Sequence, residues 1–267
     1  MNNKIGLLGI PLDFNSSYLH GPAEAPSAIR SVLESGSMNW SSESGYDLSA
    51  LEQIEDLGNL AWETQATAFP LIQKTVDEHL ASGYKVLSLG GDHSISFPIM
   101  QAYAKHFANL TILHFDAHAD LYDDFEGNPH SHASPFARIM ENNLVSRLVQ
   151  VGIRTLCPHQ RAQVERFNVE VLEMQDWSLE KADQLNISGD VYISFDIDGL
   201  DPSCAPGVSH HEPGGLLMRD VLTFIQRLNA NVVGADVVEY NPRQDFKNNM
   251  TGFVAAKLVK ELLAKML

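Results

Sequence analysis

The sequence predicts an α/β fold: a single domain of three layers, α/β/α, with a mostly parallel central sheet. Two observations predict it. Apolar runs typical of strands alternate with segments of helical spacing, and the strand runs are continuously apolar, which indicates burial on both faces. The chain has 267 residues, a length that suits one large α/β domain. No internal repeat or break in composition divides it, so we expect one domain over residues 1–267.

The predicted strands are short apolar runs bounded by turn-forming residues. The first ends at Pro11, and the second is expected at an edge of the sheet. In chain order, the strands are expected at residues 4–10, 55–60, 85–89, 110–115, 148–153, 169–172, 190–195 and 232–238. Polar or Pro/Gly-rich loops are expected over 35–49 and 202–215.

The predicted helices have apolar residues three or four positions apart, as Ile72, Val76 and Leu80 illustrate. Ser94 is expected to cap the helix that follows it, and Pro98 is tolerated in that helix's first turn. In chain order, the helices are expected at residues 27–33, 69–81, 95–107, 135–142, 160–166, 179–184, 219–228 and 251–267.

Composition excludes several classes of protein. Acidic residues outnumber basic ones 34 to 18, which argues against a nucleic-acid partner because phosphate binding needs basic patches. No apolar run is long enough to span a membrane, and the N-terminal segment lacks a signal-peptide cleavage pattern. Cys157 and Cys204 form no C-x-x-C motif. We expect reduced thiols in a cytoplasmic protein.

Metal-ligand residue types follow three of the predicted strands. Asp116, His118 and Asp120 occupy alternate positions after the strand at 110–115. His93 follows the strand at 85–89, and Asp196 and Asp198 follow the strand at 190–195. Because ligands bind beyond the carboxyl ends of strands in such sheets, we expect these side chains to meet.

A single His or Asp at a strand end is more often a cap or a turn former. Six such groups brought together would repel one another, since carboxylates ~4 Å apart cost on the order of 4 kcal/mol per pair. Divalent metal ions would remove that cost, and carboxylate with imidazole suits Mn²⁺ better than a structural zinc site. Sharing one pair of metals requires the chain to curl after Asp116, which the small residues Ala117 and Ala119 would allow.

Three motifs resemble the signatures of the ureohydrolase family, which includes arginases, agmatinases, guanidinobutyrases and formimidoylglutamases. They are Gly90-Gly-Asp-His-Ser94, Asp116-Ala-His-Ala-Asp120 and Ser194-Phe-Asp-Ile-Asp-Gly-Leu-Asp-Pro202. The resemblance covers almost the full chain. Segments such as Ala205-Pro-Gly-Val-Ser-His-His-Glu-Pro-Gly-Gly215 and Val233-Gly-Ala-Asp-Val-Val-Glu-Tyr-Asn-Pro242 look most like plant-type arginases.

The resemblance implies two Mn²⁺ ions per subunit, which lower the pKa of a water molecule that attacks a guanidino carbon. One ion would be held by His93, Asp116, Asp120 and Asp196, and the other by Asp116, His118, Asp196 and Asp198. Asp116 and Asp196 would be shared.

Three residues match the family's catalytic positions. Asp120 would orient the attacking water and pass on its proton, His132 matches a proton-shuttling histidine, and Glu239 matches the carboxylate that holds the guanidinium. Taken alone, His132 is more often a solvated loop residue, and Glu239 could be a surface cap.

Weaker predictions concern neighbouring polar residues. His114 is expected either to orient a ligand or to be an ordinary core histidine, and His210 and His211 lie in a loop that could border the site. Asp92 and Asp201 are expected to orient ligands or stabilise turns.

The expected reaction is hydrolysis of a small cationic guanidino substrate, most simply L-arginine to L-ornithine and urea. Thr155 and Cys157 replace the acidic residues that animal-type arginases carry after the corresponding strand, so agmatine or another guanidino compound is the alternative. A non-catalytic binding protein on the same fold is the remote alternative. The resemblance also implies a homo-trimer or hexamer.

Overall fold

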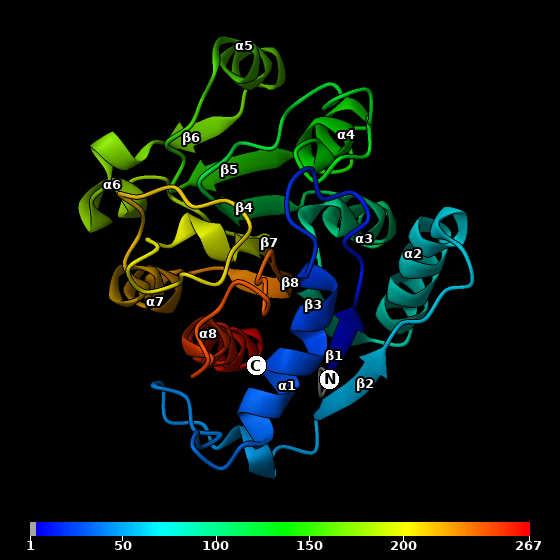
Figure 1. The fold of residues 1–267 in the computed structure, drawn as a ribbon, viewed down its shortest axis with the longest axis vertical. Helices are drawn as coiled ribbons and strands as arrows, with labels where there is room; N and C mark the ends of the chain where they lie inside the picture. Colours follow the sequence, from blue (N-terminus) through cyan, green and yellow to red (C-terminus); the bar gives the residue numbers. More distant parts are fainter. Residues whose placement is uncertain (1–3) are drawn as a thin grey trace.

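The computed structural model describes residues 4–267 and contains one sheet of eight strands. The spatial order is β2-β1-β3-β8-β7-β4-β5-β6, and every neighbouring pair is parallel (Figure 1). The strands are β1 (Lys4–Ile10), β2 (Ile54–Asn59), β3 (Tyr84–Gly90), β4 (Thr111–Phe115), β5 (Arg147–Val151), β6 (Glu170–Leu172), β7 (Asp190–Asp196) and β8 (Asn231–Val238). The predicted α/β fold is confirmed; the first three residues of the expected domain lie outside the described residues.

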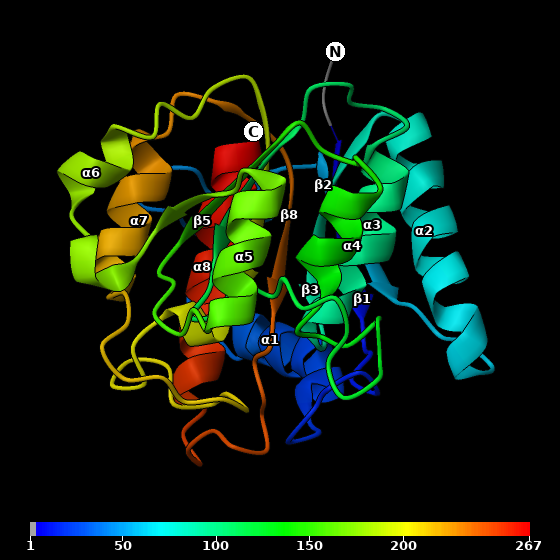
Figure 2. The same ribbon diagram turned by 90° about the horizontal axis from the view of Figure 1, so that it is seen from above.

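Helices cover both faces of the sheet. They are α1 (Ala25–Glu34), α2 (Gln65–Ala81), α3 (Ser96–Tyr103), α4 (Pro135–Glu141), α5 (Pro158–Phe167), α6 (Leu179–Asp183), α7 (Met218–Arg227) and α8 (Met250–Met266). Helices α2 to α5 form one layer, and α1 with α6, α7 and α8 forms the other (Figure 2). No helix within residues 4–267 has the length and apolar character needed to cross a membrane.

The central strands are buried on both faces because alternate residues enter different cores. In β3, Leu87 and Leu89 pack into the core under α1, α7 and α8, whereas Val86 packs into the core under α2, α3 and α4. In β4, Leu113 and Ile112 divide in the same way. This two-sided burial explains why the strand segments are continuously apolar.

One predicted cap is wrong. Before α3 the chain makes a short 3₁₀ turn, His93–Ile95, and the Asp92 side chain accepts a hydrogen bond from the backbone N–H of Ser94. Asp92 therefore caps this turn, in place of Ser94, because Asp92 has the extended backbone that an N-cap residue needs. The helix itself ends at Tyr103, four residues earlier than the expected 107.

The strand register brings the predicted ligands level with one another. Phe115 of β4 pairs with Phe195 of β7, and Asp196 of β7 pairs with Val238 of β8. Asp116 and Glu239 directly follow their strands, so both lie close to the level of Asp196. The loops that follow the strands gather at this edge, which is at the bottom of Figure 2 and faces the viewer in Figure 1.

Candidate metal centre

Three strand ends converge on the imidazole of His93. Its Nδ1 atom lies 3.3 Å from Asp116 Oδ2, 3.2 Å from Asp120 Oδ2 and 3.2 Å from Asp196 Oδ2. His93 follows β3, Asp116 and Asp120 follow β4, and Asp196 ends β7. All four side chains are buried. The structure thus assembles the first of the two predicted ligand sets.

A second cluster shares Asp116 with the first. His118 Nδ1 lies 3.3 Å from Asp116 Oδ1 and 3.2 Å from Asp198 Oδ2. Asp116 therefore presents one oxygen to each cluster, which is the arrangement expected of a ligand shared between two ions. Asp196 Oδ1 accepts the Asp198 N–H at 2.7 Å, so Oδ2 is the oxygen of Asp196 that faces the clusters.

The hydrogen bonds of His93 define which ring nitrogen carries the proton. Nε2 lies 2.9 Å from Ser194 Oγ, and that hydroxyl donates to Asp236 Oδ1 at 2.8 Å. Because the hydroxyl proton is used on Asp236, Ser194 Oγ accepts a hydrogen bond from His93 Nε2–H. The lone pair of Nδ1 then points at three carboxylates, and Nδ1 has no hydrogen-bond partner among the described residues. The Nδ1 lone pair and the three carboxylates repel one another. A divalent cation fits this environment because it would attract all four groups.

The backbone after Asp116 curls as the shared site requires. The His118 N–H donates to Asp116 Oδ1 at 2.6 Å, and Asp120 has a φ of 50°, in the left-handed region. Gly199 packs against the start of this curl, and a Cβ there would lie 2.8 Å from the backbone nitrogen of Asp116. Glycine is therefore required at 199 for the close approach of the two ligand-bearing segments.

Charge repulsion shapes the ionisation of the clustered carboxylates. Burial and the carboxylates of Asp198 and Asp116 raise the pKa of Asp196 well above its usual value. Burial also acts to raise the pKa of Asp116, but the neighbouring imidazoles of His114, His118 and His93 outweigh it and hold that pKa well below the usual range. In the metal-free cluster the carboxylates therefore repel one another, and two bound cations would offset that repulsion.

Glu239 and His132 form a buried pair beside the clusters. Glu239 Oε1 accepts from His132 Nδ1 at 2.8 Å and from the His93 backbone N–H at 2.9 Å, whereas Oε2 has no hydrogen-bond partner within residues 4–267. His132 Nε2 lies 2.8 Å from Ser17 Oγ. Glu239 has a φ of 63°, a conformation that costs a non-glycine residue about 1–2 kcal/mol. Neither residue is a solvated loop or surface group.

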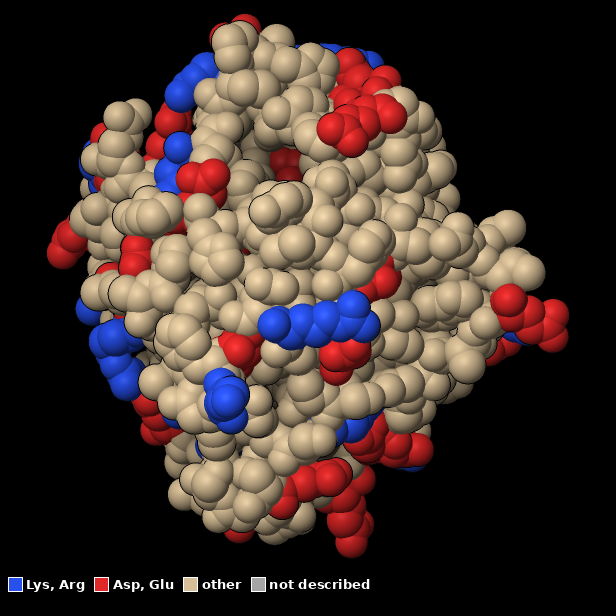
Figure 3. Space-filling model, in the orientation of Figure 1, with Lys and Arg blue, Asp and Glu red and all other residues tan. Residues whose placement is uncertain are grey.

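A cavity of about 180 Å³ opens onto these groups. In Figure 3, acidic side chains lie at the base of a hollow on the face that carries the strand-end loops. The described lining residues include no Lys or Arg; they are Ser17, His118, Asp120, Tyr122, Phe125, His132, Ala133, Thr155, Gln160, Asp196, Asp198, His210 and Glu239. Sequence reasoning did not name Ser17, Tyr122, Phe125 or Gln160 as site residues.

Of the residues predicted with less support, His210 lines the cavity, whereas His211 and Asp201 do not. The ring of His210 lies 5.3 Å from that of His132, whereas the exposed His211 bonds to the Pro206 carbonyl. Asp201 accepts backbone N–H groups of the loop that contains residues 203–215 and so stabilises a turn. Burial and the neighbouring Glu239 raise the pKa of Asp92 to about 7.

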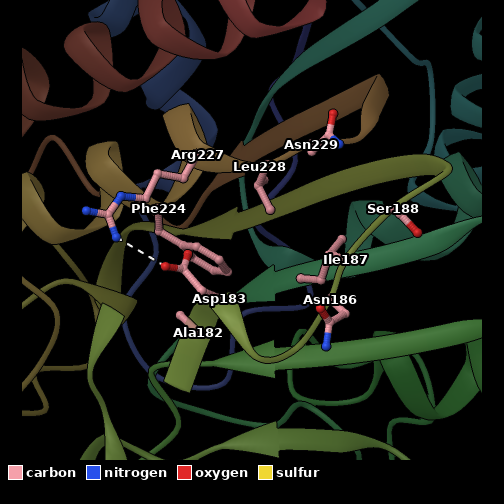
Figure 4. A pocket seen from close by; sticks show the side chains of 9 residues that line it. All are labelled: Ala182, Asp183, Asn186, Ile187, Ser188, Phe224, Arg227, Leu228 and Asn229. Atoms are coloured by element: carbon pink, nitrogen blue, oxygen red, sulfur yellow. Dashed lines mark hydrogen bonds and ion pairs between the residues drawn. The ribbon is translucent and has the colours of Figure 1, made fainter. Parts of the chain in front are cut away.

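A separate cavity of about 600 Å³ lies between α6 and α7, near the amino end of β7. Figure 4 shows its lining, in which Arg227 and Asp183 form an ion pair 3.1 Å long. None of the eight predicted site residues lines it. The smaller cavity at the carboxyl ends of the strands is therefore the candidate site, in agreement with the general position of sites in parallel sheets.

Comparison with known proteins agrees with this geometry. The arginase family model matches residues 3–264. The chain is 47% identical to the mitochondrial arginase of Medicago truncatula, over 97% of this chain and 81% of that protein, and 32% identical to the agmatinase of Bacillus anthracis, over 98% and 91%. The solved arginase structure from Medicago truncatula superimposes with a TM-score of 0.92 and 44% identity, over 99% of this chain and 88% of that one. The chain therefore belongs to the arginase family of hydrolases.

Proposed function

We propose that this protein is a binuclear manganese hydrolase that converts L-arginine to L-ornithine and urea. The observation that carries the proposal is the pair of carboxylate–imidazole clusters joined through Asp116, which open with Glu239 and His132 onto one cavity. The similarity to a plant arginase supports arginine as the substrate.

The ligand sets follow from the clusters. His93, Asp120 and one Asp116 oxygen would hold one ion, and His118, Asp198 and the other Asp116 oxygen would hold the second. Asp196 would complete both sets. When bound, the two ions would lower the pKa of a water molecule enough to make it a nucleophile at neutral pH.

The protein's own groups would bind the substrate and move the proton. Glu239 Oε2, which has no partner within residues 4–267, would accept hydrogen bonds from the planar guanidinium. The water attacks the guanidino carbon, and Asp120 accepts its proton. A C–N bond then breaks, Asp120 returns the proton to the leaving amine, and urea is released. His132 would shuttle protons between the site and solvent.

Agmatine is the second candidate substrate because the cavity lacks a cationic partner for a carboxylate. Among the described residues that line it, no Lys or Arg is present, so the carboxylate of arginine would rely on neutral donors such as Thr155 and Gln160. Agmatine lacks that carboxylate, and the chain is similar to an agmatinase as well.

The deciding experiment is urea release by the manganese-loaded protein from arginine, agmatine and 4-guanidinobutyrate, measured side by side. We expect the highest kcat/KM for arginine. A higher value for agmatine would assign the alternative substrate. Two bound Mn²⁺ ions with no urea from any of the three would overturn hydrolysis and favour a binding protein.

We also propose a homo-trimer or hexamer in the cytoplasm. The free cysteines Cys157 and Cys204 fit a reducing compartment, although the Medicago relative is named mitochondrial. Light scattering on the purified protein and fractionation of cells that express it would test the two proposals separately.

A further inference from the structure

A row of buried polar residues crosses the sheet directly beneath the candidate metal ligands. Register places Ser88, Asp236, Ser194, His114 and Gln150 side by side on β3, β8, β7, β4 and β5. Each is at most 1% exposed. Buried polar groups destabilise a core unless they are hydrogen-bonded, so a row of five in an otherwise apolar sheet calls for a specific role.

The amide orientation of Gln150 is determined by its neighbours. One contact of Nε2 is the backbone carbonyl of Ala119, at 2.7 Å, and the other is His114 Nδ1, at 3.0 Å. A carbonyl only accepts hydrogen bonds, so the NH₂ group must occupy this position. Gln150 Oε1 is then left without a partner among the described residues, which costs about 1–3 kcal/mol. The two donated bonds are retained despite that cost.

This orientation determines the role of His114. Since Nδ1 accepts from Gln150, the ring proton lies on Nε2, and Nε2–H donates to Asp116 Oδ2 at 2.9 Å. That oxygen faces His93 Nδ1. Although His114 lies close enough to His93 and Asp116 to form a possible metal-binding group, neither of its nitrogens has a free lone pair. His114 therefore orients a ligand and is not one.

We propose that Gln150 is a positioning residue that holds two metal-binding carboxylates in place with a single amide. Through His114 it sets the direction of Asp116 Oδ2, and through the Ala119 carbonyl it anchors the residue before Asp120, where the backbone turns left-handed. This proposal rests on the proposed metal-dependent function. It adds a source of pre-organisation that lies outside the ligands themselves.

The test compares Gln150→Met with Gln163→Met, titrating Mn²⁺ into each metal-free protein by calorimetry. Gln163 is a matched control: it is buried and donates to the Leu121 carbonyl at 3.1 Å and to Asp123, but it contacts no predicted ligand. Gln150→Met should weaken Mn²⁺ binding about 10- to 100-fold, and Gln163→Met should leave it unchanged. Equal affinity in both variants would overturn the proposal.

Nitrogen NMR of the histidine rings in the metal-free wild-type protein gives an independent readout. His114 should be in the Nε2–H form, and Gln150→Met should shift its Nδ1 resonance because that nitrogen loses the hydrogen bond from Gln150, whereas a purely structural role would leave the resonance unchanged. An Nδ1–H form in the wild type would overturn the proposal even if Gln150→Met does not fold. Failure of the wild type to bind two Mn²⁺ ions would instead refute the proposed function, so the two failures are distinguishable.

Discussion

The buried pair of His132 and Glu239 should make the stability of the metal-free protein depend on pH. Glu239→Gln is the perturbation, because it removes the charge but keeps an oxygen where Oε1 accepts from His132 Nδ1 and from the His93 N–H. The added NH₂ group would occupy the position of Oε2, which bonds to no group in the described part of the chain. The substitution thus keeps the packing and the hydrogen bonds to Oε1, so the comparison measures the effect of the Glu239 charge on His132.

The magnitude follows from the pKa of His132. Burial lowers this pKa, but the Glu239 carboxylate outweighs burial and, with smaller contributions from Asp120 and Asp92, raises it from 6.5 to about 9. A difference of about 2.5 units at about 1.4 kcal/mol per unit gives roughly 3 kcal/mol. Because the folded pKa is the higher one, this stabilisation is fully present below pH 6.5 and is lost as the pH rises through 9. The lowered pKa of Glu239 reports the same interaction and is not added.

The assay is urea unfolding of chelator-treated protein at a pH below 6.5 and at a pH above 9. The wild type should lose on the order of 3 kcal/mol more than Glu239→Gln across this range, since Glu239 is the largest of the groups that raise the pKa of His132. Groups that titrate alike in both proteins cancel in the comparison. His132→Asn, alone and combined with Glu239→Gln, completes a double-mutant cycle. The same pH dependence in wild type and Glu239→Gln would refute the reasoning.

Three further predictions concern the metals and the backbone that surrounds them. Asp196→Ala should lose manganese and nearly all urea formation; full activity with two bound ions would refute its shared role. Chelation of a manganese-loaded sample should lower the thermal midpoint by about 5 °C or more, since ligand at 100 times its Kd stabilises by about 2.7 kcal/mol, and an unchanged midpoint would argue against metal binding. Gly91→Ala should destabilise by about 1–3 kcal/mol in urea unfolding, because its Cβ would overlap the Leu12 backbone carbonyl; Gly6→Ala, which meets only the flexible Leu57 side chain and Tyr84, should cost less.

The sheet was predictable because burial on both faces requires strand segments that are continuously apolar. Residues such as Leu113 and Ile112 belong to opposite cores, yet both must be apolar. Segment ends were less predictable, since they depend on single hydrogen bonds. Asp92 and Ser94 are both good capping residues, and the choice between them depends on backbone angles that the residue types do not determine.

The candidate ligands were predictable for a related reason. Asp116, His118 and Asp120 alternate directly after an apolar run, and a parallel sheet brings such strand ends to one edge. The lining residues Tyr122 and Gln160 carry no comparable signal. Tyr122 lies in a loop that folds back over the edge, and Gln160 lies in α5, whose placement against that loop no short-range pattern determines.

Gln150 could be predicted from the sequence in part. It is a lone polar residue in the apolar run at 148–153, and a buried polar residue in a central strand is a signal that could have been read from the sequence. Its partners could not have been read, because His114 and the Ala119 carbonyl meet it only through the pairing of β4 with β5 and the curl after Asp116. The left-handed backbone conformations of Asp120 and Glu239 could not have been read from the sequence either. Local preference disfavours both conformations, so contacts from several strands must impose them, and those contacts converge on the carboxylates proposed to do the chemistry.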